Sequence, residues 1–213
     1  MAILKEGING PFSGKVGSIV GYQLNGQNII RGLPAVVKRK PTALTLINRG
    51  RMKAVSKFLT PIKRVIDFGY KNVAPKGSRV GTFQSAQSYI FKNAIDYGEG
   101  DAPYVNPEKV LVFQGPLMPP PRLEVARDKS LLHLTWDKDA CSTMKAVLLV
   151  FAYVPEDDVF WFEEAGAKAS KGTFTWDLAT EIRADRYEQI HVYAGFYDIR
   201  RNELSNSVYG GCV

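Results

Sequence analysis

Few residues of this sequence have the types and spacing that enzyme chemistry requires. Residues 10–17 can be compared with a phosphate-binding loop, in which backbone amides and a lysine surround the phosphates of a nucleotide. Only three residues separate Gly10 from Gly14 where that motif needs four. Val16 also stands where a metal-binding serine or threonine should follow the lysine. We therefore expect no nucleotide hydrolysis.

The other candidates for catalysis or metal binding are histidines and acidic pairs. His133 and His191, the only histidines, lie in separate expected strands and lack the paired spacing of a zinc site. No GxSxG elbow is present to carry a nucleophilic serine. Acidic pairs of this kind usually keep turns and strand edges soluble, although glycosidases use such pairs as acid and base. They are Asp137 with Asp139, Asp157 with Asp158, and Glu163 with Glu164. We expect no catalytic residue, no cofactor and no metal, and thus a protein that is not an enzyme.

One aromatic cluster could bind a sugar or a nucleic-acid base by stacking. Phe160, Trp161 and Phe162 follow one another in an expected strand. Side chains alternate between the two faces of a strand, so Trp161 faces away from its two neighbours and at least one face belongs to the core. Carbohydrate binding depends on Trp161 being exposed.

These residues belong to a C-terminal part whose pattern predicts a β-sandwich. Seven short apolar runs with turn signals between them occupy about 90 residues, which is typical of two packed antiparallel sheets. Leu132, Leu134 and Trp136 share one face of an expected strand, so Trp136 should lie in the core. Residues 108–113, further upstream, also read as a buried strand.

The N-terminal part is predicted to begin with a β-hairpin. Asn25 and Gly26 separate two apolar-rich arms, residues 16–24 and 27–33, and Asn-Gly is the preferred pair for a two-residue type I′ turn. Gly17 and Gly21 share one face of the first arm. A glycine there marks a bulge, a bend, or the close approach of another backbone or a large side chain. With Tyr22, these residues form a candidate assembly hairpin that could add to a neighbouring sheet.

Helical spacing follows in residues 42–58, 62–70 and 82–95. Thr60 and Pro61 are typical of an N-cap and a first helical position, so the second stretch is a separate short helix or the continuation of a kinked one. A helical projection places four basic side chains on one stripe away from the apolar face, and three more precede the first helix. The seven candidate contacts to a polyanion or an acidic partner are Lys38, Arg39, Lys40, Arg49, Lys53, Lys57 and Arg64.

The charge of the chain is divided unevenly. Residues 1–80 contain 15 basic and two acidic side chains, whereas the remaining 133 residues contain 13 basic and 19 acidic ones. This asymmetry favours a polyanionic partner, an acidic protein surface, or head-to-tail attraction between copies of the chain. Three successive prolines indicate a linker at residues 116–122. The expected fold is α+β, with a hairpin-and-helix domain over residues 1–115 and a sandwich domain over residues 123–213.

No stretch has the length and apolarity of a membrane span, and the first residues lack the apolar core of a signal peptide. Cys141 and Cys212 have no metal-ligand spacing and fit a compartment in which thiols stay reduced, although a bridge between them remains open. We expect a cytoplasmic or particle-associated protein.

The sequence of residues 7–34, the stretch 51–70 and the closing residues 203–209 resemble a family of uncharacterised Bacteroidota proteins, classed as a domain of unknown function. The resemblance covers nearly the whole chain and implies no activity, cofactor or site residue. The C-terminal strands also look like a fibronectin type III module, through Trp136 and a Tyr187 in the position of a tyrosine corner. This likeness implies binding or assembly and names no partner.

The sequence favours a non-catalytic structural or assembly protein, such as a self-associating subunit of a phage or another particle. Its partner would be a second copy or another protein. One alternative is non-specific nucleic-acid binding through the basic helix. A further alternative is a carbohydrate-binding sandwich.

Overall fold

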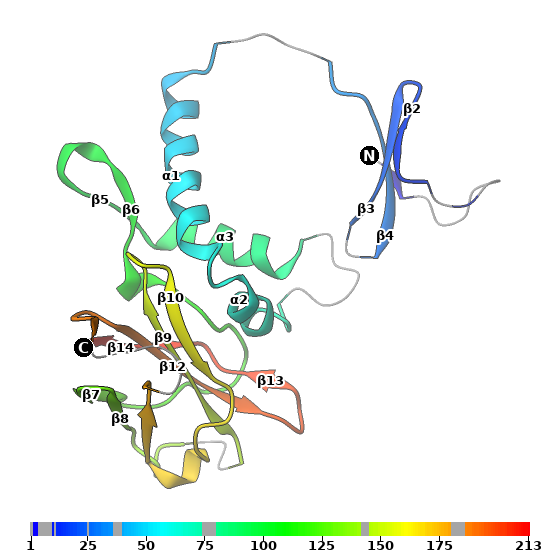
Figure 1. Ribbon diagram of the computed structural model, residues 1–213. Coiled ribbons are helices and arrows are strands. Elements are labelled where there is room, and N and C mark those ends of the chain that lie inside the picture. Colours follow the sequence, from blue (N-terminus) through cyan, green and yellow to red (C-terminus); the bar gives the residue numbers. More distant parts are fainter. Residues whose placement is uncertain are drawn as a thin grey trace.

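The computed structural model describes residues 2–3, 10, 12–24, 26–35, 40–73, 80–141, 145–179 and 186–213. Over these residues the chain is a mixed α+β protein, as the sequence predicts. It contains an N-terminal sheet, a group of helices, and two antiparallel sheets near the C-terminus (Figure 1).

The predicted hairpin is confirmed within the N-terminal sheet. Strands β1 (Ala2–Ile3), β2 (Gly14–Val16), β3 (Ile19–Leu24) and β4 (Gln27–Gly32) lie in the order β1-β4-β3-β2. Leu24 pairs with Gln27, and Gly26 in the turn has a φ of 81°. The first arm is shorter than predicted, because Gly17 has a φ of 57° and forms with Ser18 a turn that separates β2 from β3.

Three helices follow at the positions that the apolar spacing indicates. They are α1 (Ala43–Leu59), α2 (Lys63–Gly69) and α3 (Thr82–Asn93). The hydroxyl of Thr42 caps α1 by accepting a hydrogen bond from the amide of Thr45. Thr60 is not the N-cap of α2: its hydroxyl donates to the carbonyl of Ser56 at 2.6 Å and so helps to end α1. The first two helices are therefore separate.

A small hairpin and an irregular segment connect α3 to the sandwich. Strands β5 (Ile95–Tyr97) and β6 (Pro103–Val105) pair with each other, with the 3₁₀ turn η1 (Glu99–Asp101) between them. The prediction of a strand over residues 108–113 is wrong. Residues 107–109 form the 3₁₀ turn η2 (Pro107–Lys109), and the following residues are buried without strand pairing. Their apolar side chains pack beneath the helices. An apolar run can be buried in this way without forming a strand.

The C-terminal part forms two antiparallel sheets that face each other. Strands β7 (Glu124–Asp128), β8 (Leu131–Thr135) and β11 (Thr173–Asp177) make a sheet of order β11-β8-β7. The larger sheet has the order β10-β9-β12-β13, and β14 also pairs with β12. Its strands are β9 (Val147–Val154), β10 (Val159–Glu163), β12 (His191–Asp198), β13 (Glu203–Leu204) and β14 (Val208–Cys212). The 3₁₀ turn η3 (Ala169–Lys171) precedes β11.

Strand β9 is buried on both faces, and each face contributes side chains to a different hydrophobic core. Leu148, Val150 and Ala152 face the three-stranded sheet, where the core also contains Trp136 as predicted. The alternate residues of β9 are Leu149, Phe151 and Tyr153, and they face the helices. The five-stranded sheet is therefore the middle layer between the helices and the smaller sheet (Figure 1).

Buried tyrosines hold the helical layer to the middle sheet. The hydroxyl of Tyr153 donates to the carbonyl of Phe58 at the end of α1, over 3.2 Å. The hydroxyl of Tyr193 donates to the carbonyl of Pro107 over 2.8 Å. Each bond satisfies a buried polar group while its ring fills the core, so these bonds also fix the distance between layers.

The helices and the sandwich share one core, which passes through the segment before the proline-rich stretch. Val112 and Phe113 lie in the helix-side core, and the amide of Leu117 donates to the carbonyl of Leu204 at 3.0 Å. The two parts expected from the sequence therefore pack together. Whether residues 1–115 and 123–213 fold independently stays a prediction. Among the described residues, no helix is both long and apolar enough to cross a membrane.

Candidate interaction surface

The first two turns of α1, residues 43–49, are exposed on every side. Leu44 and Ile47 precede the buried Val55 and Phe58 by eleven residues each, or about 20° on a helical projection. The apolar face of α1 therefore continues past the core, and there its side chains are 65% and 50% exposed. Figure 1 shows this end of α1 extending away from α3 and the two sheets of the sandwich.

Arg51 marks the point at which the body begins to cover α1. Its guanidinium lies over the rings of Phe91 in α3 and Tyr97 in β5, at 5.6 and 5.5 Å from their centroids. Its Nε is buried and has no hydrogen-bond partner among the described residues. The two aromatic rings are therefore the main contacts of the positive charge of Arg51.

The predicted basic stripe is divided between two helices. Arg49, Lys53 and Lys57 are exposed on α1, one turn apart from each other. Arg64 is exposed but belongs to α2, so the helical projection does not extend to it across the turn at residues 60–62. Lys40 is exposed before α1. Lys38 and Arg39 lie outside the described residues.

A groove runs along the base of α1 and brings part of the stripe beside residues that the sequence analysis missed. Its volume is ≈ 710 Å³, and its walls come from α1, β6, the β9–β10 turn and the start of β12. The three ion pairs among the described residues involve neither lysine of the groove. The groove residues with polar or aromatic side chains are Lys53, Lys57, Phe58, Tyr104, Glu156 and His191. No local sequence pattern indicates that these residues lie together, because they become neighbours only when the helix packs on the sheet.

His191 and Tyr209 form a polar pair behind this groove. Nδ1 of His191 lies 2.9 Å from the hydroxyl of Tyr209, and the rings are 6.0 Å apart. Burial lowers the pKa of His191, although Glu156 and Glu108 act in the opposite direction. Burial also raises the pKa of Tyr209 to about 12. A neutral imidazole beside a neutral phenol fits a structural contact.

The candidate assembly hairpin has the features that its glycines indicate. Gly21 lies directly under Phe12, whose ring and carbonyl occupy the space of a β-carbon. This is the close approach that a strand glycine marks. Arg31 lies over the ring of Tyr22, 5.5 Å from its centroid. Asn25 lies outside the described residues.

The N-terminal sheet belongs to neither hydrophobic core. In strands β2 to β4, where burial is described, the buried positions are Gly21 and Ile29, and Ile29 is absent from both core clusters. Val16 on the edge strand β2 is 58% exposed. A small sheet with so little burial needs a covering layer for stability. We call this sheet together with residues 43–49 of α1 the N-terminal arm.

The residues considered for chemistry lie in separate parts of the described fold. Residues 14–17 of the glycine-rich stretch are a strand and a turn that lead to another strand, and not a loop before a helix. His133 is exposed on β8 and contacts Thr175. Trp161 is 7% exposed and lies in the sandwich core, with Phe160 and Phe162 packed on the opposite side. Within the described residues, no group of three potential metal ligands occurs, and both cysteines are free.

The chain was also compared with known proteins. No curated protein and no solved structure matches it. A family model matches residues 11–211, which include the hairpin of the N-terminal arm, the helices and nearly all of the sandwich. The chain thus belongs to the Family of unknown function (DUF6266).

Proposed function

We propose that this protein is a non-catalytic assembly subunit that associates with further copies of itself through the N-terminal arm. The observation that carries the proposal is the uncovered apolar surface of the arm. Of the thirteen large hydrophobic side chains exposed among the described residues, five lie in the arm, two on its strands and three in residues 43–49. A share of this size in one short part of the chain favours a protein interface there.

The rest of the molecule supports this function by offering a rigid body. Its two cores lie on either side of one sheet, and buried tyrosine hydroxyls join its layers. The net charge of the first 80 residues is opposite to that of the remainder, which favours attraction between different parts of neighbouring copies. A phage or another repeated particle would be a suitable setting.

We infer that the sandwich is fibronectin type III-like. Counting from β7, with β13 and β14 as one broken strand, the first, second and fifth strands form one sheet. The third, fourth, sixth and seventh strands lie in the other. Immunoglobulin-like sandwiches likewise separate the first, second and fifth strands from the third, sixth and seventh. Trp136 packs edge-on against Phe196, and Tyr187 against Trp161, at 6.1 and 6.0 Å. Such modules serve in binding and assembly without a catalytic site.

Light scattering after size-exclusion chromatography tests the assembly function. The mass of the full chain should rise with protein concentration at low and at physiological salt. Replacing Leu44 and Ile47 by serine should abolish that rise, because both side chains continue the apolar face of α1. Met118→Ser with Ile199→Ser is the matched control, because both side chains are also exposed but lie outside the arm. A chain that stays monomeric at every concentration would overturn the proposal.

Nucleic-acid binding is the second candidate function, favoured by one observation. Tyr104 is half exposed and lines the same groove as Lys53 and Lys57, which supplies an aromatic ring beside basic side chains. Glu156 in the same groove opposes a polyanion. A gel shift with mixed-sequence single-stranded DNA at low salt decides this, and a Lys53→Glu, Lys57→Glu variant shows whether the groove is responsible.

A further inference from the structure

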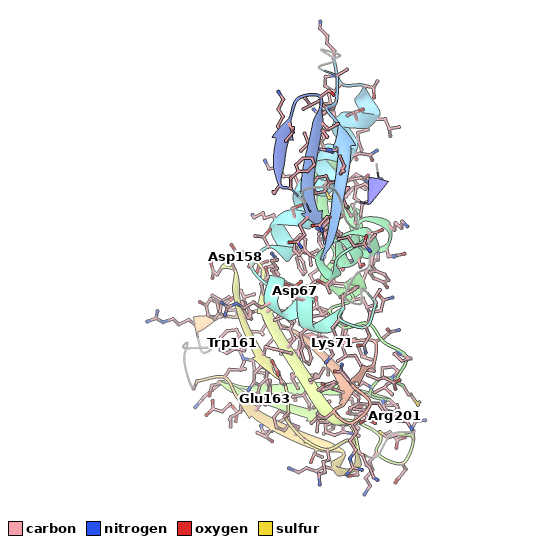
Figure 2. All side chains as sticks on the ribbon, turned by 90° about the vertical axis from the view of Figure 1, so that its right-hand side faces the viewer. Asp67, Lys71, Asp158, Trp161, Glu163 and Arg201 are labelled. Carbon is pink, nitrogen blue, oxygen red and sulfur yellow. The ribbon has the colours of Figure 1, made fainter. Side chains whose placement is uncertain are left out.

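Strand β10 is an unpaired edge of the five-stranded sheet. It pairs with β9 over its whole length, from Val159 to Glu163, and no described strand pairs with its other side. Figure 2 shows Asp158 and Glu163 towards the two ends of this strand, with Trp161 between them. The outer backbone groups of such a strand can accept a further strand.

The edge is packed on both faces, and acidic side chains at its ends are its protection against edge pairing. Phe162 packs against Phe68 of α2 at 5.7 Å, and Trp161 is buried in the sandwich core. Both faces of β10 are therefore held in place by cores. The strand contains neither proline nor lysine, the residues that most often block edge pairing.

Charge distinguishes β10 from the other edges of the two sheets. Residues 146–167 contain five acidic side chains and no basic one, and all five acids flank or end β10. The edge strand β7 contains Arg127 beside its two acids, and the edge strand β11 lies near both Lys171 and Asp177. Strand β14 carries no charge. A partner for β10 should therefore be basic.

The edge strand β2 of the N-terminal arm has the complementary charge. Lys15 of β2 is exposed, and cross-strand pairing places it, Val20 and Arg31 in one row. Residues 7–66 contain eleven basic side chains and no acid. No described strand pairs with the outer side of β2, and the β2 and β10 of one chain are not paired with each other.

We propose that β2 of one copy adds to the free edge of β10 in a second copy. The inference rests on the assembly function and names the surface that accepts the arm. Backbone hydrogen bonds between the two edges provide the pairing, and the basic row facing the acidic edge selects the partner. The contact joins two different surfaces, so each copy keeps one free arm and one free edge. Association should continue into a ladder of masses or close into a ring.

Charge reversal on the two edges tests this pairing. The edge variant is Asp157→Lys with Glu164→Lys, and both side chains are exposed and make no ion pair among the described residues. We expect its dissociation constant for self-association, measured by analytical ultracentrifugation, to rise by at least about tenfold. Lys15→Glu should act in the same direction. Lys15→Glu added to the edge variant should recover part of the loss.

A matched control carries the same change of charge on another surface. Glu124→Lys with Asp128→Lys alters two exposed acids of β7 and should leave self-association unchanged. Circular dichroism checks that every variant is folded. If the wild type associates and the edge variant associates equally well, the β10 pairing is wrong while the assembly function stands. A loss in the β7 control equal to that in the edge variant also contradicts the pairing. A wild type that never associates overturns both.

Discussion

Gly69, the last residue of α2, shows how closely the segments of this protein approach. Its missing side chain leaves room for the carbonyl of Val112 and the ring of Phe113. We expect Gly69→Ala to lower the free energy of unfolding by about 1–3 kcal/mol, because the backbone on the other side cannot yield easily. Urea unfolding monitored by circular dichroism measures the change.

Gly32 provides the control for this substitution. A β-carbon at Gly32 would meet no atom within 4 Å. Gly32→Ala should therefore change the free energy of unfolding by less than about 0.5 kcal/mol. Equal effects at the two positions would contradict the packing argument.

His191 should make the stability of the protein depend on pH. Burial lowers its pKa below the ordinary value of 6.5, so the unfolded chain binds a proton at a higher pH than the folded one. The stability from the neutral His191 is present above pH 6.5 and is lost as the pH falls through the folded pKa. The free energy of unfolding should decrease between about pH 7.5 and about pH 5.

A His191→Gln variant isolates this contribution. Asp96 also has a lowered pKa, because the side chains of Lys109 and Asn106 donate hydrogen bonds to it, but it titrates below its ordinary 3.8 and outside this range. Urea unfolding at both pH values should show a smaller decrease in the variant than in the wild type. The same decrease in both proteins would place the pH dependence elsewhere.

Single residues were predicted well where their neighbours in the sequence determine their surroundings. Trp136 in the core and the positive φ of Gly26 follow from strand alternation and turn chemistry. The predicted N-cap role of Thr60 is wrong, because its hydroxyl donates a hydrogen bond to the preceding turn of α1. Tyr104 and Glu156 of the groove could not be found, since only tertiary packing brings them to α1.

At the scale of elements, the two ends of α1 should respond differently to truncation. Leu59 is fully buried in the helix-side core, so Leu59→Ala should cost about 2–5 kcal/mol of unfolding free energy. Leu44 is on the same helix but exposed, so Leu44→Ala should change the stability of the monomer by less than about 0.5 kcal/mol. Chemical denaturation at low protein concentration measures both. A comparable loss for Leu44 would mean that its surface is covered within one chain.

Local pattern also explains which elements could be predicted. The helices and the sandwich strands have apolar periods that agree with their burial, and their positions agree with the sequence analysis. Residues 108–113 did not form a strand, because a short apolar run indicates burial without fixing the backbone. The unbroken apolar run of β9 does contain a signal for the layering: a strand covered on both faces needs no polar alternation.

At the scale of the molecule, the arrangement of layers could not be predicted from the sequence. The prolines at residues 119–121 indicate a break in secondary structure, and a break of this kind does not prevent the segments on either side from sharing a core. The charge asymmetry, in contrast, was readable directly. The structure adds that the basic part includes an uncovered surface, while the acidic part includes a free strand edge.

The division between body and N-terminal arm predicts the behaviour of a shortened chain that begins at residue 41. Both hydrophobic cores consist of residues from Val55 onwards, and the cap at Thr42 is retained. The thermal midpoint of the shortened chain should therefore lie within about 3 °C of the full-length value at low concentration, since no core contact is lost. The same chain should remain monomeric at concentrations where the full chain associates, because β2 is gone. Scanning calorimetry and light scattering measure the two properties. A large fall in the midpoint would show that the N-terminal sheet stabilises the body of its own chain. Association without that sheet would place the interface on residues 43–49 of α1 or on the body.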